Sequence, residues 1–212
     1  MGQYYRPTIV APDGRIMSLD THTFDSGAKL TEHSWISNEL VNAAYSLMLD
    51  SPKRVAWIGD YALDPYDRES DGSGTSDYPY IKAMTLETFQ PYYDSAWGEE
   101  SQQLDKKLFS KKDLNILNHN TTGMYLVNHT KQVYINLETY IYDCSVKGGT
   151  WDGWCMNPLP LLTACGNGQG GGDYHDSRSS YEDIGIWAFD SLEYTDTVSD
   201  GFSEVSFRFF DN

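Results

Sequence analysis

Apolar and polar residues follow patterns in the first part of the chain that predict a hairpin and then a helix. Two β-prone runs, at 4–10 and 15–19, flank a short segment with Pro and Gly, which supply the backbone dihedrals of a turn. With Ser37 as the N-cap and Pro52 as the stop, the residues between them predict an amphipathic helix. The apolar positions of one helical face carry this prediction: Leu40, Val41, Ala44, Leu47 and Met48.

The next apolar run predicts a buried strand that ends in an acid. Residues 54–58 are mostly apolar and lead to Asp60, so this carboxylate is expected at the C-terminal end of the strand. The segment 85–97 is ambiguous, because its apolar residues have helical spacing while Pro91 would remove a helical hydrogen bond.

Short strands dominate the pattern in the second half of the chain. Residues 124–127 and 133–137 alternate well and predict a hairpin, and 184–189 with 205–210 predict the last strands. The glycine run 166–172 interrupts the sheet.

Together these segments predict an α+β fold with a mixed or mainly antiparallel sheet and two or three helices. A chain of 212 residues fits one globular domain, 1–212, because a single core can grow to about this size before chains divide. The stretch 64–79 is rich in Asp, Ser, Gly and Pro and is expected to be an exposed acidic loop.

Charge narrows the classes of partner. The chain has 31 Asp and Glu against 15 Lys and Arg, a formal net charge of -16, which repels both phosphate backbones and anionic lipids. Nucleic acid and membrane surfaces are therefore not expected as direct partners, whereas a basic protein or a cation is. With 40% hydrophobic residues the chain has ample material for a core, which excludes the disordered class.

The cysteines and the N-terminus predict a location in the cytoplasm. No apolar run of signal-peptide or membrane-spanning length is present, so nothing is expected to export or anchor the chain. Cys144, Cys155 and Cys165 are odd in number and form no CxxC pair, which disfavours a disulfide framework and a structural zinc site. All three thiols are therefore expected to be reduced.

The glycine run is the most unusual segment and supplies the candidate catalytic residues. Gly166, Gly168 and Gly171 match the pattern GxGxxG, but a polar segment follows instead of a helix, so a tight structural turn is the alternative to nucleotide binding. Asp173 and His175 alternate on one face of an extended chain, and with Asp60 they could ligate a metal or transfer a proton. The alternative is a surface Asp beside a hydrogen-bonded His. Cys165 is either a nucleophile or, more simply, a small buried thiol.

The acidic loop supplies the candidate metal ligands Asp67, Glu69 and Asp71, because oxygens at alternate positions before Gly72 resemble the start of a calcium loop. The twelfth position is Tyr78 where such loops need a bidentate Glu, so a solvated loop is the preferred interpretation. No cofactor is predicted, and a divalent cation is the alternative.

Several blocks occur through nearly the whole sequence: MGQYYRP at 1–7, GAKLTEHSW at 27–35, VAWIGDYA at 55–62, LVNH at 126–129, and PLPLLT at 158–163 with GNG at 166–168 and DY at 173–174. Together these blocks resemble a family of uncharacterised bacterial and phage proteins. The resemblance implies that the protein acts in a bacterial cytosol and is encoded by a bacterium or a phage. It implies no catalytic residues. The candidate ligand-binding residues lie in these blocks: Asn128, His129, Asn167, Gly168 and Tyr174.

Two functions remain open. The preferred hypothesis is a non-enzymatic acidic binding or regulatory protein, of inhibitor or immunity type, which acts by contact with a basic surface of another protein. The alternative is a small enzyme or ligand-binding protein with a polar pocket formed by the glycine run 166–172, Asp60, Asp173 and His175. Convergence of the three side chains would favour the alternative.

Overall fold

A continuous mixed sheet forms the centre of the computed structural model, which describes residues 3–64, 84–98, 108–117, 121–144, 155–166 and 183–207. Its eight strands have the order β2-β1-β3-β7-β4-β5-β8, with β6 beside β3. Two pairs, β3 with β6 and β5 with β8, are parallel and the others are antiparallel. The strands are β1 Tyr5–Val10, β2 Ile16–Ser18, β3 Lys53–Gly59, β4 Tyr125–Asn128, β5 Val133–Asn136, β6 Ala164–Cys165, β7 Ser191–Thr195 and β8 Ser203–Glu204.

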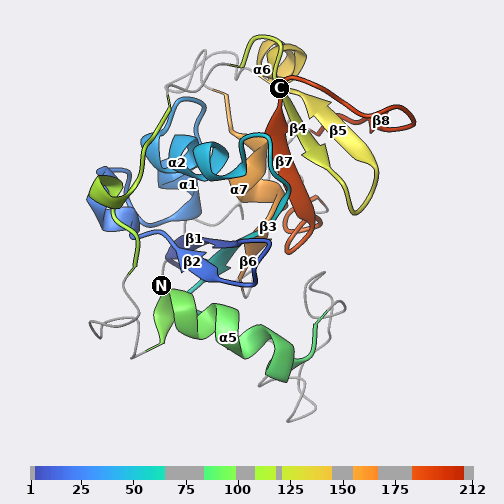
Figure 1. The fold of residues 1–212 in the computed structure, drawn as a ribbon. Helices are drawn as coiled ribbons and strands as arrows, with labels where there is room; N and C mark the ends of the chain where they lie inside the picture. The colour runs from blue at the N-terminus through green and yellow to red at the C-terminus, as the bar shows by residue number, and fades with distance from the viewer. Residues whose placement is uncertain are drawn as a thin grey trace.

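Helices cover both faces of the sheet, so the fold class is α+β, as the sequence predicts. The α-helices of the described residues are α1 Leu30–His33, α2 Glu39–Met48, α5 Leu86–Trp97, α6 Leu137–Cys144 and α7 Pro158–Leu162. Figure 1 shows α1, α2 and α7 on one side of β1 and β3, and α5 on the other side. No helix in the described ranges is long and apolar enough to cross a membrane.

Strand β3 organises the core because its side chains alternate between the two faces. Val55 and Trp57 belong to the larger hydrophobic cluster, which includes side chains of α2 and α7. Ala56 and Ile58 belong to the second cluster, where Phe89 of α5 is also fully buried. A sheet strand covered on both faces reads as a continuous apolar run, which is why the sequence could predict it.

The opening hairpin and the amphipathic helix are confirmed. β1 and β2 pair in antiparallel register, with Ile9 opposite Met17. The cap of α2 differs from the prediction, because Asn38 and not Ser37 accepts hydrogen bonds from the N–H groups of Leu40 and Val41. An Asn at this position satisfies donors that have no partner within the helix.

Segment 85–97 is helical in spite of Pro91. Thr85 caps α5, and Pro91 lies inside the helix with an exposed ring. Burial of Phe89, Tyr92 and Ala96 against the sheet favours the helix, since an apolar face supplies most of a helix's stability in a protein. Packing therefore outweighs the cost of the missing hydrogen bond.

The last strands differ from the prediction. Residues 184–189 form turns and not a strand, and Gly185 and Phe189 have φ angles of 76° and 64°, which an extended strand does not permit. The strand that follows is β7, at Ser191–Thr195. Of the predicted strand at 205–210, residues 205–207 have no strand structure and 208–210 lie outside the described residues, while β8 covers Ser203–Glu204.

Two helices, α6 and α7, lie where the sequence predicts no helix. Leu137 begins α6 instead of ending β5. The proline-rich block forms α7, which begins after Asn157, whose side chain accepts a hydrogen bond from the N–H of Leu159. Pro158 is tolerated at the first helical position because its missing N–H would have no intrahelical partner there.

Candidate functional site

Three of the candidate residues, Asp60, Asn128 and His129, lie in the part of the chain that the structure describes. The other candidates fall outside the described ranges: Asp67, Glu69, Asp71, Asn167, Gly168, Asp173, Tyr174 and His175. The acidic loop beyond Asp64 and the glycine run beyond Gly166 lie outside these ranges as well. In the described part of the chain, no group of three or more His, Cys, Asp or Glu side chains could hold a metal ion.

Asp60 follows the last residue of β3, as predicted, and its backbone and side chain are both engaged. Its Oδ1 accepts a hydrogen bond from the N–H of Tyr4 at 3.1 Å, and its own N–H donates to the carbonyl of Tyr4 at 2.9 Å. The hydroxyl of Tyr93 donates to the Asp60 carbonyl at 2.8 Å. Burial raises the pKa of the Asp60 carboxyl, and the Tyr4 N–H acts in the opposite direction.

The parallel pair β3 and β6 brings the start of the glycine run to the same sheet edge as Asp60. Ile58 is in register with Cys165, so Gly59 and Gly166 are the next residues of the two strands. A Cβ atom at Gly166 would lie 2.3 Å from both the Gln3 Oε1 and the Tyr5 hydroxyl, so only glycine fits there. Asp60 and Gly166 therefore lie at neighbouring strand ends.

Asn128 belongs to a buried polar cluster on the core side of β4. The side chain is fully buried, and its Nδ2 donates to Oδ2 of Asp190 at 2.7 Å. Its Oδ1 accepts from the backbone N–H of Lys131 at 3.0 Å, and the Lys131 ammonium pairs with the same oxygen of Asp190. The amide thus closes the β4–β5 turn and orients Asp190, which is the work of a structural residue.

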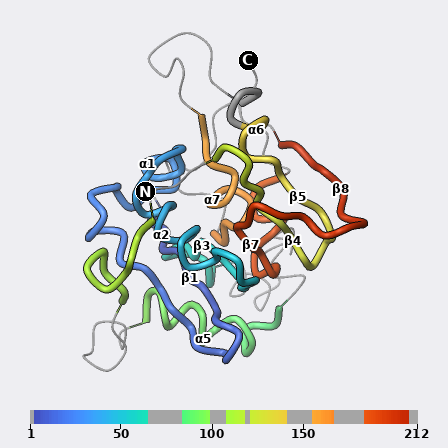
Figure 2. Tube along the Cα trace, turned by 45° about the horizontal axis from the view of Figure 1, so that its top comes forward, coloured from blue at the N-terminus to red at the C-terminus, as the bar shows by residue number. Residues whose placement is uncertain are grey.

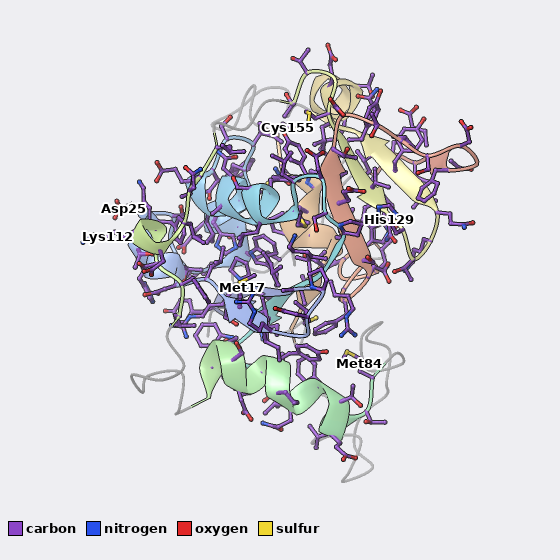
Figure 3. All side chains as sticks on the ribbon, viewed as in Figure 1. Met17, Asp25, Met84, Lys112, His129 and Cys155 are labelled. Atoms are coloured by element: carbon purple, nitrogen blue, oxygen red, sulfur yellow. The ribbon has the colours of Figure 1, made fainter. Side chains whose placement is uncertain are left out.

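His129 belongs to a second cluster, which it forms with Glu193 of β7. Its Nε2 lies 2.7 Å from Glu193 Oε2, and the two side chains are 29% and 16% exposed. The ring also packs edge-on against Phe202, with 5.6 Å between the ring centroids. Figure 3 shows His129 beside β4 and β7, on the same side of the molecule as β8.

The segment 183–207, which includes β7, is acidic and has no Lys or Arg of its own. Residues 183–207 contain no Lys or Arg and six acids: Asp183, Asp190, Glu193, Asp196, Asp200 and Glu204. We call residues 196–204 the acidic arm; its three acids are exposed and, among the described residues, none of them is in an ion pair. Figures 1 and 2 show the arm at the outside of the molecule, beyond β5.

The basic side chains of the β4–β5 turn contact other acids. Lys131 pairs with Asp190, and His129 contacts Glu193. Lys131 is the sole Lys or Arg of the described ranges 121–144, 155–166 and 183–207. Among the described residues, the arm therefore presents its negative charge to the solvent without an ion-pair partner.

The cysteines correct the expectation that every thiol is free. Cys155 is disulfide-bonded, and its partner is outside the side chains that the structure describes. Sequence spacing could not reveal this bond, because a disulfide depends on spatial proximity and not on a CxxC pattern. Cys165 is free and fully buried, and burial raises the pKa of its thiol. A buried, protonated thiol agrees with the core interpretation and not with a nucleophile.

His33, which lies in the block at 27–35, has a structural role. The ring is fully buried, and its Nε2 accepts a hydrogen bond from the Trp57 indole N–H at 2.8 Å. Burial lowers the pKa of His33 to about 3, and the Gly27 carbonyl acts in the opposite direction. The ring is therefore neutral and fixes Trp57 in the core.

Comparisons of the chain with protein-family models, curated proteins and solved structures find no match. The functional interpretation of the site therefore rests on the geometry described above. Sequence patterns miss Asp190, Glu193 and the acidic arm, and the available signal for them is the absence of Lys and Arg from 183–207.

Proposed function

We propose that this protein is a non-enzymatic acidic binding protein that contacts a basic surface of another protein, as an inhibitor or immunity-type factor does. The observation that carries the proposal is the acidic arm, whose exposed Asp196, Asp200 and Glu204 lack a cationic partner among the described residues. The net charge of -16 adds a long-range attraction for basic partners. Such complementarity acts mostly on association rate and specificity.

The arm is also held in place, which favours binding. Phe202 contacts His129, and backbone hydrogen bonds join Ser203 to Gln132 and Val205 to Tyr134. An ordered surface loses less conformational entropy when it binds than a free loop does. These contacts anchor the C-terminal part of the arm, next to Glu204, to the sheet.

The test measures binding of a basic probe, polylysine of defined length, over a range of salt concentrations. The variant Asp196→Asn/Asp200→Asn/Glu204→Gln removes the charges of the arm. The matched control, Asp25→Asn/Asp50→Asn/Glu87→Gln, removes three exposed charges elsewhere. We expect the arm variant to bind about tenfold more weakly at low salt, a loss of about 1.4 kcal/mol, and to show a flatter salt dependence.

Equal losses in the two variants would mean that net charge alone attracts the probe and that the arm has no special role. Absence of binding by the unmodified protein at low salt would contradict the proposed function as a whole.

One observation favours the alternative of a ligand pocket. The register of β3 and β6 supports a site in which Asp60 and the glycine run contribute from neighbouring strand ends, since open sheets often bind ligands beyond the carboxyl ends of their parallel strands. Under this second proposal Asp173 and His175 complete the pocket, and a small ligand rather than a protein occupies it.

A further inference from the structure

The two ends of the sheet differ in how their outer edges are covered. At the β2 end, Phe109 accepts a hydrogen bond from the N–H of Asp20 and donates its own N–H to the carbonyl of Ser18, both at 2.9 Å. This contact occupies backbone groups that the last strand would otherwise present to solvent. At the β8 end, no further segment of the described chain pairs with the sheet.

The backbone of β8 is hydrogen-bonded to β5 on one side, and no other described strand pairs with it on the other side. The N–H groups of Ser203 and Val205 donate to the carbonyls of Gln132 and Tyr134, at 3.1 and 2.9 Å. Because alternate residues of a strand direct their backbone groups to opposite sides, the N–H and C=O of Glu204 are directed outward. Both residues of β8 are exposed.

Aromatic contacts fix both flanks of this strand. Phe202 packs on His129 at its start, and Phe207 packs edge-on against the buried Trp187 beyond its end, with 5.5 Å between ring centroids. An edge that is already extended and fixed can accept another strand with little loss of conformational entropy.

We propose that the outer edge of β8 binds an extended, basic segment of the partner protein, which adds to the sheet as a further strand. The inference rests on the proposed function and names the form of the partner. Main-chain hydrogen bonds to Glu204 supply the alignment, and Lys or Arg side chains of the segment meet Asp196, Asp200 and Glu204. The charges that keep a second copy of this acidic chain from the edge attract a basic strand.

The experiment separates charge from strand addition with two probe peptides of equal charge. One alternates Lys and Thr, which suits an extended strand, and the other alternates Lys and Pro, whose proline residues lack the N–H that a strand donates. Binding of both is measured by calorimetry with the unmodified protein. We expect the Lys–Thr peptide to bind about tenfold more tightly than the Lys–Pro peptide.

Two variants at one position test the backbone directly. Glu204→Gln removes the charge and keeps the N–H, whereas Glu204→Pro removes both, at an edge position where no backbone hydrogen bond of the described residues is lost. The Tyr134 hydroxyl donates to the Glu204 carboxylate at 3.4 Å, and both substitutions remove this carboxylate. We expect Glu204→Gln to weaken the binding of both peptides by a similar factor. Glu204→Pro should in addition reduce the affinity of the Lys–Thr peptide to that of the Lys–Pro peptide. Melting temperatures of the two variants show whether each one remains folded.

Equal affinities of the two peptides for the unmodified protein would overturn strand addition and leave the proposed function standing, and this comparison does not depend on any variant. Equal effects of the two substitutions on the Lys–Thr peptide would also overturn it. Binding of neither peptide would contradict the proposed function together with the inference.

Discussion

Neighbouring polar residues in this protein have different roles because β4 ends between them. Asn128, the last residue of β4, is buried and binds Asp190, while His129, the first residue of the turn, contacts Glu193 and Phe202. Adjacent candidates in a sequence can therefore belong to two different clusters.

The buried His33 predicts how stability depends on pH. Its pKa is lowered to about 3 from the ordinary value of 6.5 for a histidine, so between these values the unfolded chain binds a proton that the folded chain does not. The contribution of His33 is fully present above pH 6.5 and is lost as the pH falls toward 3. This one proton gives the unfolding free energy a slope of up to about 1.4 kcal/mol per pH unit. We expect His33→Gln, which removes the proton site, to flatten the slope of unfolding free energy measured by denaturant titration from pH 4 to 6. An unchanged slope would contradict a neutral buried ring.

At the scale of elements, the sequence predicts those segments whose apolar pattern has a single period. The opening hairpin, α2, β3 and the β4–β5 hairpin were predictable for this reason. Residues 184–189 look like a strand because they are apolar, but the positive φ angles of Gly185 and Phe189 form turns. The sequence does not predict β7, because its buried positions result from pairing with both β3 and β4. A local sequence pattern carries no information about such pairing.

The candidate site was predictable in part for the same reason. Asp60 at a strand end, and Asn128 and His129 at a hairpin, follow from local patterns. Their partners Asp190 and Glu193 are more than 60 residues away in sequence and meet them through the β4–β7 pairing. Tertiary pairing of this kind cannot be deduced from one sequence.

Helix α5 predicts a gain in stability from one substitution. Pro91 is exposed inside the helix and cannot donate the hydrogen bond that this position otherwise makes. We expect Pro91→Ala to raise the free energy of unfolding by about 1 to 3 kcal/mol, measured by urea denaturation. The control Phe89→Ala removes a fully buried side chain from the same helix and should lower it by about 3 to 5 kcal/mol. Destabilisation by Pro91→Ala would contradict this expectation. It would show that proline stabilises the protein more, by restricting the unfolded chain, than the missing helical hydrogen bond costs.

For the molecule as a whole, the distribution of charge matters more than its sum. Some exposed acids pair with cations, as in Asp13–Arg15 and Glu39–Lys111, whereas the three acids of the acidic arm have no ion pair among the described residues. The arm also coincides with the end of the sheet at which no further described strand pairs with β8. Charge and an available strand edge therefore occur at the same place.

Amide hydrogen exchange in the presence and absence of the Lys–Thr peptide tests the central claim most directly, because it locates the bound region without a substitution. Our account predicts that exchange slows at Glu204, whose N–H is directed outward in the free protein, and in the neighbouring residues of the acidic arm. The ends of β3 and β6, at Gly59, Asp60 and Gly166, should be unaffected. Protection at these strand ends with none in the arm would contradict the account and favour the ligand pocket.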